Sequence, residues 1–158
     1  MAEQSHPLNF LFGTWKGTGK GVYPTISPFE YEEEISFTPS PKGFLIYSQR
    51  SWTLDEVKKP LHVETGYVRV PNPKKVEMVI SQPTGVVSVE EGTIDGTVIQ
   101  VETISLARTS SAKAPYVTQF VRRFQVNVEE STLHSTMGMA TEATDLTQHL
   151  ESTLKRID

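Results

Sequence analysis

The sequence predicts an all-β fold of about ten short antiparallel strands, closed into a barrel or packed as a sandwich. Three observations carry this prediction. Apolar and polar residues alternate with a period of two through successive short segments. Turn-forming stretches such as TPSPKG (38–43) and VPNPKK (70–75) separate these segments. No segment sustains a helical repeat over three turns, so the chain has no room for crossover helices between parallel strands.

The predicted strands follow a short apolar opening, PLNFLFG (7–13), which is expected to form a short helical turn that ends at Gly13. They span residues 17–23, 31–38, 44–53, 62–70, 75–81, 85–94, 97–107, 116–126, 132–140 and 146–157. Asp95-Gly96 is a strong signal for a tight hairpin turn. The segment ARTSSAKAP (107–115), rich in small and polar residues, is expected to be the loosest loop. A barrel of this strand number is wider than its own side chains can fill, which predicts an internal cavity.

Length and composition exclude several classes of protein. The 158 residues suggest a single domain spanning 1–158. The net charge of −4 argues against a nucleic-acid-binding surface, which carries a basic excess. The absence of cysteine excludes disulfides, thiolate nucleophiles and cysteine-ligated zinc or iron–sulfur clusters. Neither a signal peptide nor a membrane helix of about 20 apolar residues is expected, so the predicted location is cytoplasmic.

The glycine-rich stretch GTWKGTGKGVYPTI (13–26) resembles a phosphate-binding loop only superficially. Such a loop leads into a helix and often ends in Gly-Lys-Ser/Thr, and both features are missing here. Gly17, Gly19 and Gly21 share one face of the predicted strand with Trp15. Missing side chains on that face permit a bend, the close approach of another backbone, or a flat ligand. The spacing favours a bend that closes the barrel, with Trp15 packed at the barrel end.

The four histidines are the imidazole ligands that the sequence offers to a metal. No two of them have the spacing of a multi-histidine zinc site. His6 is expected in a frayed N-terminus, and His134 could face solvent or the interior. His62 and His149 lie in predicted strands. A single axial histidine can hold a haem, because the porphyrin supplies four ligands, but spacing alone does not reveal such a site.

Acidic residues cluster at 32–34 and 90–91, and we interpret them as mostly solvated strand faces and turns rather than acid/base pairs. Arg122 and Arg123 are adjacent, so in a strand they point to opposite faces and make no basic patch. RTSSAK (108–113) offers serines and a lysine, yet nothing in the pattern places a general base beside a serine.

Four motifs in order resemble the nitrobindin family of haem-binding β-barrels, which is also found as the C-terminal domain of a THAP-type zinc-finger protein. They are the glycine-rich stretch, HVETGYVR (62–69), TGVVSVEEG (84–92) and TQHL (147–150). The family pattern Gly-x-Trp-x-Gly-x-Gly is matched at Gly13, Trp15, Gly17 and Gly19, and the similarity runs over nearly the whole chain. The resemblance implies one nitrobindin-like domain: a ten-stranded antiparallel up-and-down barrel, similar to lipocalins and fatty-acid-binding proteins, with one haem b per chain at its open mouth.

The resemblance also assigns site residues. It implies that His149 is the axial ligand of the haem iron and that His62 lies on the distal side. Thr25 of the YPT motif matches a haem-contacting position, and Lys113 matches a basic residue near the haem propionates. The implied activity is isomerisation of peroxynitrite to nitrate at ferric haem, with His149 and His62 as catalytic residues, together with nitric oxide binding at ferrous haem.

Two other functions stay open at this point. The barrel could be a lipocalin-like intracellular carrier of an apolar ligand, without catalysis, or a haem-based nitric oxide sensor or store. Because the chain has no cysteine, it has no THAP-type zinc finger, and a role on DNA does not carry over. Neither nucleic acid nor membrane is an expected partner. The sequence leaves the oligomeric state open, including a homodimer.

Overall fold

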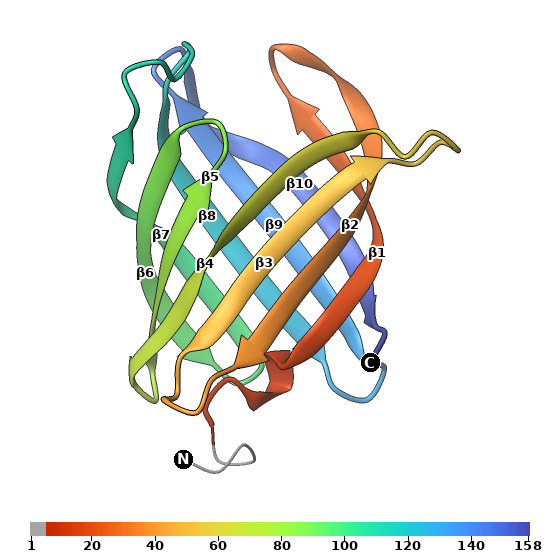
Figure 1. The fold of residues 1–158 in the computed structure, drawn as a ribbon, viewed down its shortest axis with the longest axis vertical. Coiled ribbons are helices and arrows are strands. Elements are labelled where there is room, and N and C mark those ends of the chain that lie inside the picture. The colour runs from red at the N-terminus through yellow and green to blue at the C-terminus, as the bar shows by residue number, and fades with distance from the viewer. Residues whose placement is uncertain (1–5) are drawn as a thin grey trace.

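The computed structural model describes residues 6–158, which form a closed barrel of ten antiparallel strands (Figure 1). Every predicted strand is present. The strands are β1 (Gly13–Tyr23), β2 (Ile26–Pro39), β3 (Leu45–Thr53), β4 (Pro60–Asn72), β5 (Lys75–Gln82), β6 (Val86–Asp95), β7 (Val98–Arg108), β8 (Val117–Asn127), β9 (Thr132–Thr141) and β10 (Thr144–Arg156). Each strand pairs with its neighbour in sequence, and β1 pairs with β10 to close the barrel. The fold is therefore an up-and-down barrel rather than a sandwich.

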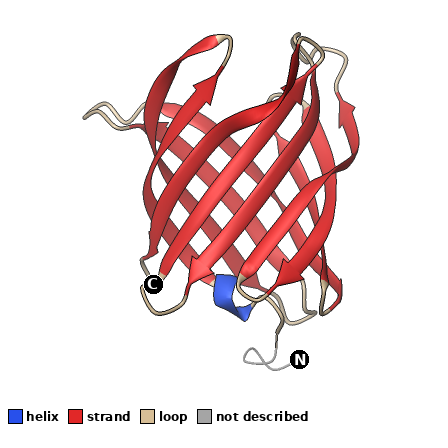
Figure 2. Ribbon diagram, turned by 180° about the vertical axis from the view of Figure 1, so that it is seen from behind, coloured by secondary structure: helices blue, strands red, loops and turns tan. Residues whose placement is uncertain are grey.

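The lower end of the barrel is closed by the N-terminal segment (Figure 2). A 3₁₀ helix, η2 (Asn9–Leu11), lies there, as the apolar opening predicts, and Gly13 follows it with a φ of 115°. The indole of Trp15 is buried and its Nε1–H donates to the carbonyl oxygen of Leu11 at 2.9 Å. Trp15 thus packs at the barrel end and ties β1 to the helix that plugs it.

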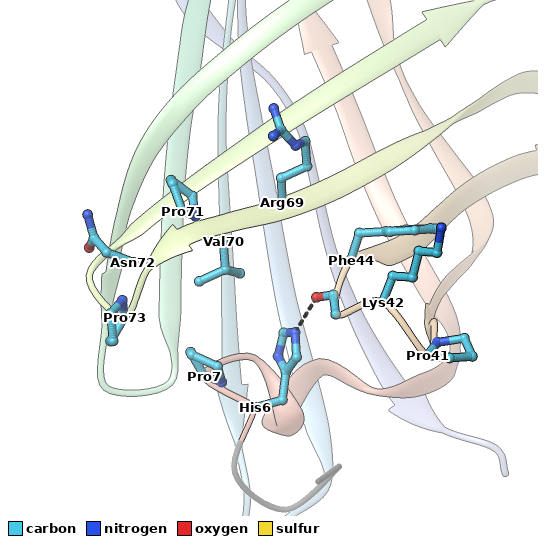
Figure 3. A pocket seen from close by; sticks show the side chains of 11 residues that line it. His6, Pro7, Pro41, Lys42, Phe44, Arg69, Val70, Pro71, Asn72 and Pro73 are labelled. Atoms are coloured by element: carbon cyan, nitrogen blue, oxygen red, sulfur yellow. Dashed lines mark hydrogen bonds between the residues drawn. The ribbon is translucent and has the colours of Figure 1, made fainter. Parts of the chain in front are cut away.

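His6 belongs to this plug, which corrects the expectation of a frayed N-terminus. His6 is only 7% exposed. The Leu8 N–H donates to Nδ1 at 3.0 Å, so the proton is on Nε2, which donates to the carbonyl of Gly43 at 2.7 Å (Figure 3). The ring thereby fastens the N-terminal segment to the β2–β3 turn. A groove of about 610 Å³ beside it is bordered by Lys42 and Arg69.

The glycines of β1 allow close packing against both neighbouring strands. A Cβ on Gly17 would lie 2.2 Å from the carbonyl oxygen of Thr153, so β10 could not approach a larger residue there. On the other side the cross-strand partner of Gly19 is Tyr31, whose ring occupies the space that a side chain would fill. The flat group that lies against Gly19 is therefore the aromatic ring of Tyr31.

The closed half of the barrel holds an apolar core. Phe37, Tyr47 and Phe124 project inward from β2, β3 and β8, and the Phe37 and Phe124 rings meet edge-to-face with centroids 5.5 Å apart. Buried apolar side chains from β4, β5, β7, β9 and β10 complete this layer. Since the core fills only one half, the interior near the opposite end is available for a site. In the described chain no helix has the length and apolar character needed to cross a membrane.

Candidate functional site

A cavity of about 840 Å³ lies at the open end of the barrel, between β4, β8, β9 and β10 and the β5–β6 and β7–β8 connections. This volume is in the range of sites for small molecules and cofactors. Its apolar lining comes from Val86, Val117, Phe120, Met137, Met139 and Leu150. We call it the mouth cavity. The internal cavity that the strand number predicts is therefore present, and its walls suit a large apolar ligand.

His149 of β10 lines the mouth cavity and is held by β1. Its Nδ1 lies 2.9 Å from the carbonyl oxygen of Val22. A carbonyl oxygen only accepts, so Nδ1 carries the proton and Nε2 keeps a free lone pair. The Tyr23 ring meets the imidazole edge-on at 5.1 Å, and the Tyr23 hydroxyl donates to the carbonyl of Met139 at 3.1 Å. The imidazole is thus fixed in the tautomer that a metal ligand needs.

An irregularity of β10 explains how His149 reaches the cavity. The pairing of β10 with β9 shifts by one residue between Gln148 and Leu150. In a regular strand, adjacent side chains would point to opposite faces. At a bulge the extra residue is re-aimed, and here both His149 and Leu150 line the mouth cavity.

His62 of β4 also lines the mouth cavity, and behind it lies a buried polar cluster. Its Nε2 is 3.0 Å from Oε1 of Glu64, a carboxylate that is only 2% exposed. The other oxygen of Glu64 accepts from the Tyr47 hydroxyl at 2.8 Å and from Nη1 of Arg122 at 2.6 Å. The Nε of Arg122 donates in turn to Glu90 at 2.8 Å. We call Glu64, Arg122 and Glu90 the buried ion cluster.

Charge within this cluster follows from burial and from the single guanidinium. Burial opposes ionisation of Glu64, but the charge of Arg122 and the hydrogen bond from His62 outweigh it and lower the pKa of Glu64 to about 2. For Glu90 burial prevails, and its pKa is raised despite Arg122. Burial disfavours the charged Arg122, yet the two carboxylates raise its pKa. Glu64 and Arg122 therefore form a persistent buried ion pair.

The interpretation of the acidic runs as mostly solvated is wrong for Glu33 and Glu90. Both are buried, and burial raises the pKa of Glu33, whose carboxylate accepts from Ser152 at 2.6 Å and from Gln49 at 2.8 Å. The reason is the alternation of the strand: Glu34 is more exposed and bonds to an exposed arginine, whereas Glu33 faces inward.

Arg122 was missed as a functional candidate, although its orientation is as predicted. Arg122 faces inward, and Arg123 lies on the other face, bonded to Gln125. A signal was available: Phe120, Arg122 and Phe124 share one parity, so an arginine interrupts a series of inward apolar residues. What it would pair with lies on other strands, and no local pattern identifies that.

The remaining predicted residues are spread around the mouth. Lys113 lines the cavity from the β7–β8 loop, together with Arg108, whose guanidinium stacks 4.4 Å above the Tyr116 ring. Thr25 lies in the exposed β1–β2 turn and is not among the residues that line the cavity. His134 lies on the outer face, bonded to Glu151 at 2.8 Å. Of the predicted site residues, the structure therefore brings together His149, His62 and Lys113.

The chain matches a family described as "THAP4-like, heme-binding beta-barrel domain" over residues 4–156. It is 41% identical over 154 residues to a Homo sapiens protein named "Peroxynitrite isomerase THAP4", covering 96% of this chain and 26% of that protein, so the chain spans about a quarter of that relative. It is 40% identical to "Peroxynitrite isomerase 2" of Mycobacterium marinum, with 99% of both chains covered. The crystal structure of Rv2717c from M. tuberculosis superposes with a TM-score of 0.88 at 36% identity, covering 100% of this chain and 99% of that one.

Proposed function

The chain belongs to the THAP4-like, heme-binding beta-barrel family, and from this premise we propose that it is a haem-dependent peroxynitrite isomerase that also binds nitric oxide. Relatives of nearly equal length support the activity, since they carry the name peroxynitrite isomerase and align over 99% of both chains. The match to only a quarter of the human relative is consistent with an activity that resides in the barrel. The chain acts as a single domain in this proposal.

The hydrogen bond between His149 and Val22 is the observation that carries the proposal. It leaves Nε2 of His149 unprotonated, and an imidazole in this state is the usual axial ligand of a b-type haem. Metal-ligating histidines almost always donate their second N–H to a carbonyl or carboxylate, as His149 does. Because the chain has one such histidine at one mouth cavity, we expect one haem b per chain.

The walls of the mouth cavity fit the rest of a haem. The porphyrin is largely apolar and would be covered by side chains such as Phe120 and Met137. Its two propionates are anionic and are stabilised by cations. Lys113 of the β7–β8 loop and Arg108 at the end of β7 both line the cavity. We assign both to the propionates. Thr25, in the exposed turn next to the strand that holds His149, stays a prediction as a haem contact.

Ferric haem, when bound, supplies a Lewis-acidic position at which the peroxynitrite anion can rearrange to nitrate without gain or loss of atoms or electrons. The protein supplies the rest. The Val22 carbonyl polarises His149 and raises its basicity as a ligand. The apolar walls exclude water from the anion. His62 lines the same cavity, where an N–H of its ring can donate to the anion.

The test is the reaction of the ferric, haem-loaded protein with peroxynitrite in a stopped-flow instrument, followed by nitrate and nitrite analysis. We expect faster decay and a higher nitrate yield than in buffer. Unchanged decay in a protein that binds haem would remove the isomerase and leave the nitric oxide sensor. If the protein showed no haem spectrum and bound an apolar ligand with an affinity that His149→Ala does not change, it would instead be a carrier. Cytoplasmic location and oligomeric state stay predictions.

A further inference from the structure

A second, much smaller cavity inside the barrel adjoins the mouth cavity. The inner cavity has a volume of about 20 Å³, enough for a single water molecule. The side chains that line both cavities are His62, Met137 and Leu150. Among these, within the described chain, His62 alone carries polar side-chain atoms that could meet an anion from below.

The contact with Glu64 determines which nitrogen of His62 is free. Glu64 is ionised, with its pKa lowered to about 2, so its oxygen can only accept. The atom 3.0 Å from that oxygen is Nε2, and Nε2 must therefore carry a proton. Within residues 6–158 the contact with Glu64 is the only hydrogen bond of the His62 ring, so Nδ1 has no partner there. His62 lines the mouth cavity, and Nδ1 is its unpartnered nitrogen.

Glu64 can hold this position because it is itself held from two further strands. Tyr47 on β3 and Arg122 on β8 both donate to its second oxygen, at 2.8 Å and 2.6 Å. Arg122 is 4% exposed and is anchored to Glu90 on β6. The first oxygen of Glu64 is left for His62. Residues from four strands thus support the one carboxylate that bonds to the His62 imidazole, whose side chain is 30% exposed.

We propose that Glu64, backed by Arg122 and Glu90, is a positioning residue that orients His62 with Nε2–H toward the barrel interior and Nδ1 toward the mouth cavity. A small anion is then bound together with one proton, which Nδ1 takes up, so that the new Nδ1–H donates a hydrogen bond to the anion. The part concerning the anion rests on the proposed haem function, whereas the orientation of His62 does not. If Glu64 only filled space in the interior, His62 would not need to keep one tautomer, and replacing Glu64 would not change anion binding.

The chain contains a matched control for this contact. His134 and Glu151 form the same kind of pair, Nε2 to carboxylate oxygen at 2.8 Å, but with side chains 39% and 49% exposed. An exposed pair is weakened by water and salt, and its geometry is not enforced by neighbours. Glu151→Gln therefore repeats the chemical change of Glu64→Gln without the buried cluster behind it.

The first experiment uses the haem-free protein with ¹⁵N-labelled histidine. Long-range ¹H–¹⁵N spectra report which ring nitrogen is protonated, and solvent exchange of that proton reports how firmly it is held. We expect His62 in the Nε2–H form with a protected proton, and at least about tenfold faster exchange in Glu64→Gln, because a charge-assisted hydrogen bond is lost. Glu151→Gln should leave His62 unchanged. A His62 proton that exchanges equally fast in wild type and Glu64→Gln would overturn the proposal.

The second experiment titrates azide into the ferric, haem-loaded protein and follows the absorption spectrum. We expect azide to bind roughly threefold to tenfold more weakly in Glu64→Gln and in His62→Leu, which is the loss of about one hydrogen bond. His62→Leu keeps Tyr47 and Arg122 on Glu64, so it remains informative if Glu64→Gln does not fold. Unchanged azide affinity in His62→Leu would overturn the proposal while leaving haem binding intact. A wild-type protein that takes up no haem would instead remove the proposed function, and the first experiment would still decide the orientation of His62.

Discussion

The Nδ1 atom of His149 lies 2.9 Å from the carbonyl oxygen of Val22, a residue 127 positions earlier in the chain. The contact joins β10 to β1, the two strands whose pairing closes the barrel. Closure and site are therefore linked, since the strand pairing that completes the fold also brings the acceptor to the histidine. This relationship leads to predictions about the site and about the barrel that supports it.

Removing the Tyr23 ring is expected to weaken haem binding without removing a ligand. Its edge packs on the His149 imidazole with centroids 5.1 Å apart, so Tyr23→Ala frees the ring to rotate away from Val22. Loss of such a supporting contact costs about tenfold in affinity. Haem transfer to apomyoglobin measures the change. Tyr23→Phe keeps the ring and should lie close to wild type, and equal losses in both variants would speak against the ring contact.

Replacing Arg122 by methionine should strongly destabilise the protein. The substitution leaves Glu64 and Glu90 buried without their cation, which costs about 3–5 kcal/mol in the free energy of unfolding. Urea unfolding of the haem-free protein measures it. Arg123→Met is the matched control, since the Arg123 side chain bonds to Gln125 on the outer face, and a change within about 0.5 kcal/mol is expected. Similar losses in the two variants would contradict the buried ion cluster.

Glu64 should make stability depend on acid in a defined pH window. Its pKa is about 2 in the folded protein against 4.5 for an unperturbed glutamate. A carboxyl whose pKa is lowered by folding stabilises the protein fully at pH values above its pKa in the unfolded chain. This stabilisation is lost as the pH falls toward 2. The stability advantage of wild type over Glu64→Gln should therefore shrink by ~3 kcal/mol between pH 6 and pH 2. Chemical unfolding across this range is the measurement.

Glu33 should make the free energy of unfolding depend on pH in the opposite direction. Burial raises the pKa of its carboxyl, so the folded state binds its proton more tightly than the unfolded state. The free energy of unfolding of wild type, relative to that of Glu33→Gln, should therefore fall as the pH rises above the pKa of Glu33 in the unfolded protein. In the same pH range, Glu64→Gln should show its full loss of stability. If both differences changed in the same direction with pH, the assigned charge states of the two carboxyls would be wrong.

Any side chain at Gly17 should destabilise the barrel. A Cβ there would meet the carbonyl oxygen of Thr153 at 2.2 Å, and this backbone atom moves only if β1 and β10 separate. We expect Gly17→Ala to cost about 1–3 kcal/mol and to weaken haem binding, because the same strands hold His149. Gly138→Ala is the control, since the nearest atom lies at 3.4 Å. Thermal unfolding of both variants tests this, and equal melting temperatures would contradict it.

The alternation of apolar and polar residues was sufficient to predict all ten strands, because it is a local property of each segment. It left barrel and sandwich open, since the pairing of β1 with β10 joins the two ends of the chain. His62 and Glu64 share a parity and could be expected on one face. The bulge that turns His149 inward leaves no mark in the pattern, and its assignment came from family resemblance. Arg122 and Glu90 meet from different strands, which no spacing encodes.

Hemin titration of the haem-free protein, followed by absorption, tests the central claim that His149 holds a haem. Wild type should develop a Soret band that saturates at one haem per chain. His149→Ala should lose this spectrum, whereas His134→Ala, which removes an imidazole from the outer face, should retain it. A His149→Ala protein that binds hemin with the wild-type affinity and spectrum would contradict the account.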